Sequence, residues 1–170
     1  VEADGLVIVN INDALNSNHE NVVMMFLDVL SKRWPRIDIL ITGFSGAGYF
    51  PNQVRYPGKD DHEVGRIREQ YFAHNLCKYA DRLKPRLVVP FAPGFALLEE
   101  HNRWVNEVKF DRQRLTAYHE EHIGPLGETH YLVLWPGDRI EGMDAVASSP
   151  YHAQLANGGL YHLLDDTYPE

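Results

Sequence analysis

Apolar runs alternate with helix-patterned segments along most of the chain, and this alternation constrains the fold most strongly. Residues 6–11 (LVIVNI), 37–42 (IDILIT) and 86–91 (RLVVPF) are short, apolar and rich in β-branched side chains, as expected of strands buried on both faces. Residues 20–34 and about 60–83 separate these runs and carry apolar side chains at helical spacing. Strand–helix–strand alternation builds a largely parallel sheet. The sequence therefore predicts an α/β fold.

The two long helical segments have recognisable ends and one apolar stripe each. Pro35 stops the first, and Asp60 or Asp61 caps the second. The first stripe is predicted to bury Val23, Phe26, Leu27, Leu30 and Trp34, and the second Val64, Ile67, Tyr71, Leu76, Tyr79 and Leu83. Further predicted elements are helices over 96–100 and 111–121, a strand over 130–135 and a turn at 136–138, followed by a poorly patterned tail.

Composition excludes several classes of protein. The formal net charge of −8 argues against nucleic-acid binding, which draws its affinity from clustered Lys and Arg. No apolar run approaches the roughly 18 residues that span a bilayer. With Cys77 as the one cysteine, an internal disulfide and a CxxC metal site are excluded, and a reducing, cytoplasmic setting is expected. Because Val1 comes shortly before a strand-like run, we expect the sequence to begin inside a longer polypeptide.

Polar or glycine-rich segments follow each of the three apolar runs, where ligands bind in parallel α/β sheets. Asp13 follows the first run and could bind a cation, or it could cap the next turn as Asx residues do. The loop FSGAGYFPNQVRYPG (residues 44–58) follows the second run, and its glycines would let backbone approach a ligand. His101 lies after the third run. It is a candidate ligand, general acid or substrate contact, or it pairs with Glu99 or Glu100.

The remaining motifs point to chemistry less sharply. His119 and His122 have the i, i+3 spacing of two metal ligands on one helical face, although HEEH is equally typical of a solvated helix end. His74 lies in a long helix and is predicted to pack or to face water. The chain has no GxGxxG or GxxxxGK[ST] motif, and Ser45 is not set between glycines at both offsets of the G-x-S-x-G nucleophile motif.

Several segments in order resemble one family. VNIND, DILITGFSGAGYFPN, LKPRLVVPFAPGF with HNRWVNE, and VLWPGD resemble the C-terminal half of metallo-β-lactamase-fold proteins, nearest to the branch of CMP-sialic acid hydroxylase. GFALLEEH is similar to a segment of N-acyl-phosphatidylethanolamine phospholipase D, another member of that fold. The resemblance covers about residues 6–140. It implies half of an αββα sandwich, with a mixed sheet and flanking helices, over residues 1–140, and a C-terminal extension over 141–170.

The resemblance also implies half of a metal site. Asp13 matches the family's bridging Asp, whereas the expected terminal His near Phe91 or Ala92 is absent. Either His101 takes over that role or one ligand is lost. No HxHxDH motif occurs, so most ligands for a divalent metal, Zn or Fe, would come from an N-terminal half in the same gene or on a second chain. Asp13 and His101 would be both catalytic residues and metal ligands.

The same resemblance suggests a substrate and leaves rival functions open. Tyr49, Gln53, Arg55, Tyr56 and Asn102 would contact the substrate, Arg55 being a natural partner for phosphate or carboxylate. The first hypothesis is part of a metal-dependent enzyme, a hydrolase or an oxygenase-associated domain, acting on a polar, phosphorylated or nucleotide-sugar metabolite. The second is a non-catalytic α/β module that binds a ligand or partner after losing its metal ligands. A third, a doubly wound domain, would be distinguished by its strand order. The sequence also leaves room for an oligomer.

Overall fold

The computed structural model describes residues 1–12, 19–44, 50–51, 53–91 and 96–152. Asp13 and Tyr49 lie outside these residues. The chain divides into two compact units. Unit 1 comprises Val1–Ala47, Ile67–Gly94 and Phe110–Val133, and unit 2 comprises Gly48–Arg66, Phe95–Lys109 and Leu134–Glu170. The domain boundary that the sequence predicts at residue 140 stays a prediction.

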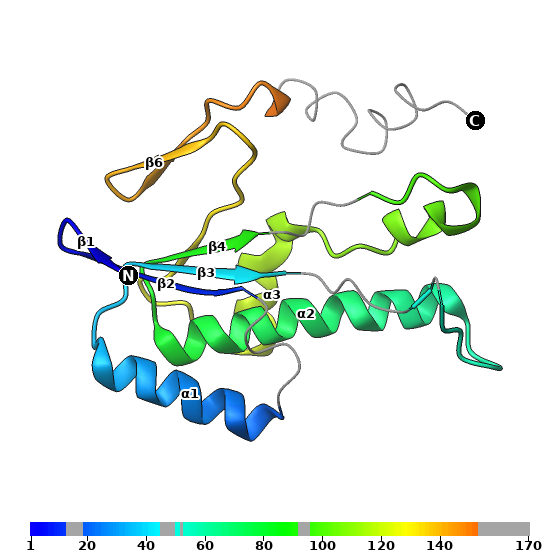
Figure 1. Ribbon diagram of the computed structural model, residues 1–170, viewed down its shortest axis with the longest axis horizontal. Coiled ribbons are helices and arrows are strands. Elements are labelled where there is room, and N and C mark those ends of the chain that lie inside the picture. Colours follow the sequence, from blue (N-terminus) through cyan, green and yellow to red (C-terminus); the bar gives the residue numbers. More distant parts are fainter. Residues whose placement is uncertain (13–18, 45–49, 52, 92–95, 153–170) are drawn as a thin grey trace. The chain divides into compact units, whose positions relative to one another are not determined.

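Unit 1 is built on a mixed five-stranded sheet. Its strands are β1 (Glu2–Ala3), β2 (Leu6–Asn12), β3 (Ile39–Gly43), β4 (Leu87–Phe91) and β5 (His130–Tyr131). They lie in the order β1-β2-β3-β4-β5, with β1 antiparallel to β2 and the other four strands parallel (Figure 1). The predicted α/β class is confirmed. The order of these described strands contains no reversal, so they do not form the doubly wound alternative.

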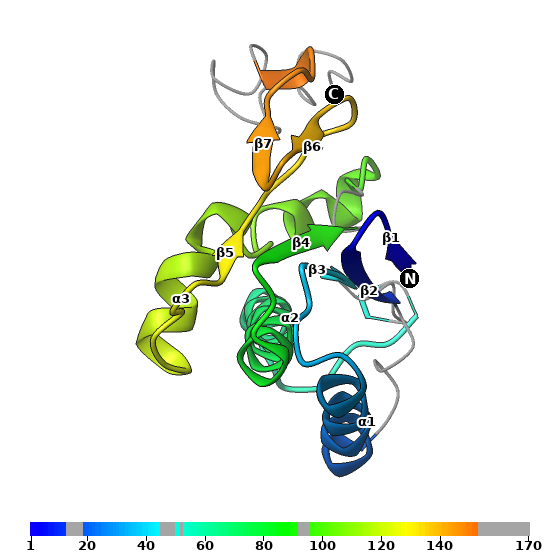
Figure 2. The same cartoon turned by 90° about the vertical axis from the view of Figure 1, so that its left-hand side faces the viewer.

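The three α-helices of the described residues pack on one face of this sheet. They are α1 (Glu20–Arg33), α2 (Asp61–Leu83) and α3 (Leu115–His122), and α1 and α2 run side by side on the same side of the strands (Figure 2). Their buried side chains join Val9, Leu40 and Val88 in one hydrophobic core. Because side chains alternate along a strand, the opposite face carries a second apolar set, Ile8, Ile39, Ile41, Leu87 and Val89, together with the exposed Asn10 of β2.

The two long predicted helices are present, but part of each predicted stripe is wrong. Val23 and Leu27 are buried, whereas Phe26, Ile67 and Tyr71 are exposed. Ile67 and Tyr71 share a helical face with Lys78 and Arg82, whose ion pairs with Glu20 and Asp28 of α1 place that face beside α1 rather than beneath the sheet. No helix in the described part of the chain is long and apolar enough to cross a membrane.

The carboxylate of Asp38 joins the starts of three strands. Asp38 is 1% exposed, and its Oδ2 accepts the Val7 N–H at 2.9 Å while its Oδ1 lies 3.1 Å from Arg36 Nη2 and 3.5 Å from Arg86 Nη1. Its own backbone N–H donates to Val7 O, and its carbonyl accepts from Leu87 N–H. The Val7 N–H, outweighing desolvation and aided by Arg36 and Arg86, lowers the pKa of Asp38. The side chain and backbone of Asp38 together thus hold β2, β3 and β4 at the same end of the sheet.

Unit 2 holds elements that the sequence did not predict. A 3₁₀ helix, η1 (Glu100–Asn106), replaces the helix predicted over 96–100, and a hairpin of β6 (Arg139–Glu141) and β7 (Asp144–Val146) occupies part of the unpatterned tail. The predicted turn at 136–138 is present. There Asp138 accepts backbone N–H groups of Trp135, Ser148 and Ser149 and contacts His152. Desolvation raises the pKa of Asp138, but these hydrogen bonds outweigh it and hold that pKa at about 2.

Asp38→Asn tests whether the buried carboxylate stabilises the sheet. Losing the charge while both arginines remain should lower the free energy of unfolding at pH 7 by about 2 kcal/mol, the usual worth of charge-assisted hydrogen bonds. Because folding lowers the pKa of Asp38, the stabilisation that its carboxylate gives the fold is present above the unfolded pKa of ~3.9. It disappears as the pH falls through the pKa of the folded state. The variant should therefore lose stability less steeply in acid, as measured by urea unfolding across pH.

Asp28→Asn is the matched control, because Asp28 forms a half-exposed pair with Arg82. Surface pairs contribute below about 1 kcal/mol. If both variants lose the same stability, Asp38 has no special role in the sheet.

Candidate functional site

Five of the predicted site residues lie in unit 2. Gln53, Arg55 and Tyr56 are exposed in the loop before α2, and His101 and Asn102 lie in the first turn of η1. His101 is exposed, whereas Asn102 is buried and engaged in interactions within the protein. Their roles toward a substrate stay predictions.

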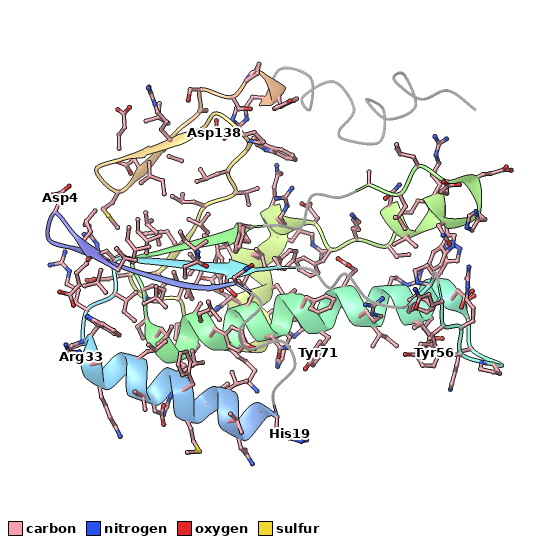
Figure 3. All side chains as sticks on the ribbon, viewed as in Figure 1. Asp4, His19, Arg33, Tyr56, Tyr71 and Asp138 are labelled. Carbon is pink, nitrogen blue, oxygen red and sulfur yellow. The ribbon has the colours of Figure 1, made fainter. Side chains whose placement is uncertain are left out.

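Trp104 of η1 is the centre around which this part of unit 2 assembles. The His62 ring at the start of α2 lies 4.5 Å from the Trp104 ring, at 35°, and the edge of Phe50 contacts it at 6.1 Å. The Arg55 guanidinium carbon lies 5.9 Å from the Trp104 ring centroid. Tyr56, which contacts Phe50, lies close to the amino-terminal end of α2 (Figure 3). We call Phe50, Arg55, Tyr56, His62 and Trp104 the Trp104 cluster.

Arg55 is the cationic member of the cluster. It forms an ion pair with Asp61 through Nη1, and its side chain remains 45% exposed. A guanidinium has five N–H donors in a planar fork, and a cation–π contact with an aromatic ring favours one position for it. Arg55 is thus held from one side by Asp61 and Trp104 while it stays open to water. This arrangement suits a phosphate or carboxylate ligand.

His101 lies on the same side of η1 as Trp104. Side chains three residues apart eclipse one another in a 3₁₀ helix, which aligns His101 with Trp104. The segment before η1 is fixed by Asn106, whose Oδ1 accepts the Leu97 N–H at 2.9 Å and whose Nδ2 donates to Leu97 O at 2.8 Å. Unit 2 therefore brings an indole and the Arg55 guanidinium into contact from two separate stretches of sequence, with His101 one 3₁₀ turn before the indole.

Gly65 allows η1 to approach α2. A Cβ at this position would lie 2.8 Å from Val108 Cγ2 and 3.2 Å from Trp104 Cζ3, so no larger residue fits without displacement. The sequence reasoning missed His62 and Trp104. The glycine inside a predicted helix was the one available signal of close packing.

Gly65→Ala should move Trp104. Alanine normally stabilises a helix interior by about 1 kcal/mol over glycine, but overpacking against a stiff β-branched Val108 costs roughly 1–3 kcal/mol. We expect a net loss of stability and a shifted Trp104 emission maximum, measured in a Trp34→Phe, Trp135→Phe background. The same substitution at the exposed turn residue Gly142 is no control, because φ is +69° there. Val108→Ala should restore the emission of Gly65→Ala, and a failure to do so would contradict the proposed contact.

Unit 1 contains a second cluster of polar side chains, and this cluster lies in the interior of the unit. His119 Nδ1 lies 2.8 Å from Tyr131 Oη, and Tyr131 also hydrogen-bonds the Cys77 thiol. Burial raises the pKa of Cys77 to about 11, raises the pKa of Tyr131 and lowers the pKa of His119, so all three groups are neutral at pH 7. A protonated thiol in the core is a poor nucleophile. These residues act as a polar part of the core.

The described residues contain no group of three or more His, Cys, Asp or Glu side chains able to hold a metal ion. His119 is buried against Tyr131 while His122 is exposed beside Tyr118, so the two imidazoles do not face one site. His74 packs edge-on against Tyr118. Within the part of the chain that is described, the side chains do not form a metal centre by themselves.

Comparison of the chain with protein-family models, with curated proteins and with solved structures finds no match. The function must be argued from the chain itself.

Proposed function

We propose that the chain is the C-terminal half of a metal-dependent metallo-β-lactamase-fold enzyme. The enzyme would be a hydrolase or would carry an oxygenase-associated domain, and its substrate would be a polar, phosphorylated or nucleotide-sugar metabolite. The supporting observation is the packing of α1, α2 and α3 on one face of the sheet, with an apolar opposite face.

This packing is what half of an αββα sandwich requires. Each sheet of such a sandwich buries one face under helices and the other against the second sheet. The set Ile8, Ile39, Ile41, Leu87 and Val89 has the chemistry of a sheet face that packs on another sheet. A sheet with one solvated face would alternate apolar with polar residues, as β2 does at the exposed Asn10, whereas β3 and β4 stay apolar on this face.

Asp13 and His101 would be the metal ligands contributed by this chain. Asn12 ends β2 with φ at +45°, so the strand stops there, and Asp13 is the next residue in the sequence. His101 is exposed on η1, so it is accessible to a metal or substrate that another polypeptide would help to hold. The other ligands would come from an N-terminal half. A bound divalent metal would supply an activated water or a Lewis acid.

Metal analysis of the natural polypeptide that carries this sequence, with any chain that co-purifies, tests the proposal. We expect Zn or Fe in stoichiometric amount by mass spectrometry, falling at least ~10-fold in affinity in Asp13→Ala and His101→Ala. Asp144→Ala and His130→Ala, at exposed positions of β7 and β5, are matched controls that should keep the metal. A metal-free wild type, or equal losses in all four variants, would refute the proposal.

The Trp104 cluster favours a second candidate, a non-catalytic module that binds an anionic ligand. The half-exposed Arg55, oriented by Asp61 and Trp104, supplies a fixed cation, and the exposed Tyr56 supplies a ring on which a planar base could stack. Such a module needs no metal.

Binding of CMP, followed by Trp104 emission in the background lacking the other tryptophans, separates the candidates. Arg55→Gln should weaken binding at least ~10-fold and Arg55→Lys by less, because lysine keeps the charge but loses the bidentate fork. Arg66→Gln, at an exposed position of α2, is the control. Binding that survives Asp13→Ala in a metal-free protein supports the module. Binding unaffected by Arg55→Gln would show that the Trp104 cluster is not the anion site.

A further inference from the structure

The side chain of His119 is buried with one of its two ring nitrogens unpaired. His119 is 1% exposed, and its Nδ1 lies 2.8 Å from the hydroxyl oxygen of Tyr131. Among the described residues, its buried Nε2 has no hydrogen-bond partner. Unpaired polar atoms are rare in protein interiors, and each requires an explanation. The cluster of Cys77, His119 and Tyr131 therefore has a feature that packing alone does not explain.

The hydrogen-bond network assigns the hydrogen of the neutral His119 ring to Nδ1. Tyr131 also hydrogen-bonds the Cys77 thiol, so its one O–H can donate to Cys77 while its oxygen accepts from His119. This arrangement leaves Nε2 as a bare lone pair. The other tautomer would leave a buried N–H donor unpaired, which is rarer than an unpaired acceptor. The neutral ring thus fits its surroundings without a second partner.

A protonated His119 does not fit the same surroundings. The imidazolium has two N–H donors, and the Tyr131 oxygen can accept only the one on Nδ1. The Nε2–H would then be an unpaired donor that carries part of a buried charge, and both are costly in a protein interior. Water must reach Nε2 before His119 can hold a proton at low cost.

The charges around His119 do not reverse this preference. Desolvation lowers the pKa of His119 and outweighs the attraction of Asp81 and Glu120. Asp81, near the end of α2, already forms an ion pair with Lys84, whose own charge opposes protonation of the imidazole. Glu120, on α3 itself, is exposed to water. The Cys77 thiol of α2 and the Tyr131 phenol of β5 are neutral and supply no compensating charge.

His119 and Tyr131 belong to one short segment at the edge of the sheet. α3 and β5 lie side by side there (Figure 2), and we call residues 115–131 the α3–β5 segment. β5 pairs with β4 at two residue positions, whereas β3 pairs with β4 at five. Further anchors are the buried Leu115 and the Thr129 hydroxyl, which donates to Pro85 O at 2.7 Å. This edge is therefore held less extensively than the centre of the sheet.

We propose that the α3–β5 segment is a pH-sensitive switch, in which protonation of His119 releases α3 and β5 from α2 and β4 while the rest of the sheet stays folded. The Nδ1–H remains bonded to Tyr131, so the helix and the strand open together and water reaches Nε2. Opening also uncovers Cys77 of α2, which is 0% exposed in the closed state. Because the chain on both sides of Phe110–Val133 belongs to unit 2, the switch acts on the connection between the two units.

The direction of the response follows from the lowered pKa of His119. The opened segment binds the proton more tightly than the closed one. Closure is therefore most stable above the opened-state pKa of ~6.5 and weakens as the pH falls from there through the pKa of the closed state. One proton changes the opening constant by at most ~10-fold per pH unit. The carboxylate of Asp38 acts only below pH ~3.9, so the two effects are separable.

Amide hydrogen exchange of the natural polypeptide that carries this sequence tests the switch. Protection is measured by mass spectrometry at pH ~7.5 and ~5.5 and is normalised to the exchange rate of the unfolded chain at each pH. We expect the opening constant of α3 and β5 to be at least ~5-fold larger at the lower pH, whereas amides of β2 and β3 should change less than ~2-fold. Unchanged protection of α3, or an equal loss in β3, overturns the proposal.

His119→Asn removes the titrating group and should reduce this pH response below ~2-fold. His122→Asn is the matched control, because His122 lies on the same helix with its side chain 43% exposed, and it should respond like the wild type. A response that persists in the first variant or disappears in the second contradicts the proposal. Tyr131→Phe serves if circular dichroism shows that His119→Asn does not fold. It should raise opening at both pH values and keep the ~5-fold ratio, and a ratio below ~2-fold refutes the switch.

The Cys77 thiol provides an independent measurement of opening. Its reaction with a dipyridyl disulfide is followed by the mass of the labelled peptide, and its rate is divided by that of a cysteine in a short peptide at the same pH. This ratio removes the dependence of the reaction on the thiolate fraction. It should rise at least ~5-fold between pH ~7.5 and ~5.5 in the wild type and less than ~2-fold in His119→Asn. A constant ratio in the wild type overturns the release of α3 and β5 from α2.

Discussion

A single buried carboxylate aligns the sheet on which the rest of unit 1 is built. The carboxylate of Asp38 accepts the backbone N–H of Val7 in β2, and the Asp38 backbone N–H donates to the Val7 carbonyl. The Asp38 carbonyl accepts the backbone N–H of Leu87 in β4. This fixes the register in which Ile39 faces Ile8 on one side and Leu87 on the other. Thr42 pairs with Pro90 in the same register and, after a register shift between Asn10 and Asn12, with Asn12. The carboxyl ends of the strands, where α/β sheets bind ligands, are thus aligned by the Asp38, Arg36 and Arg86 ion cluster at the amino ends.

The sequence predicts this sheet well because strands buried on both faces leave a continuous apolar run. Residues 6–11 and 86–91 match β2 and β4 to within one residue, and Asp60 caps α2 by accepting the Glu63 N–H as predicted. The buried faces of α1 and α2 were harder to predict. In a helix that is apolar on two sides, a 3.6-residue period marks both faces equally, and only tertiary contacts select one. Hence Phe26, Ile67 and Tyr71 were wrongly predicted to be buried.

Some residues of the candidate site could likewise be predicted from the sequence, and others could not. Arg55 could be singled out from the sequence because a lone cation in a glycine- and aromatic-rich loop suggests an anion partner. Trp104 and His62 could not, because their stacking arises when η1 and the start of α2 meet, and the sequence marks that approach only by Gly65. The β6–β7 hairpin was not predicted from the sequence for a similar reason. Its strands are short, and its anchor is a set of hydrogen bonds to Asp138 rather than an apolar pattern.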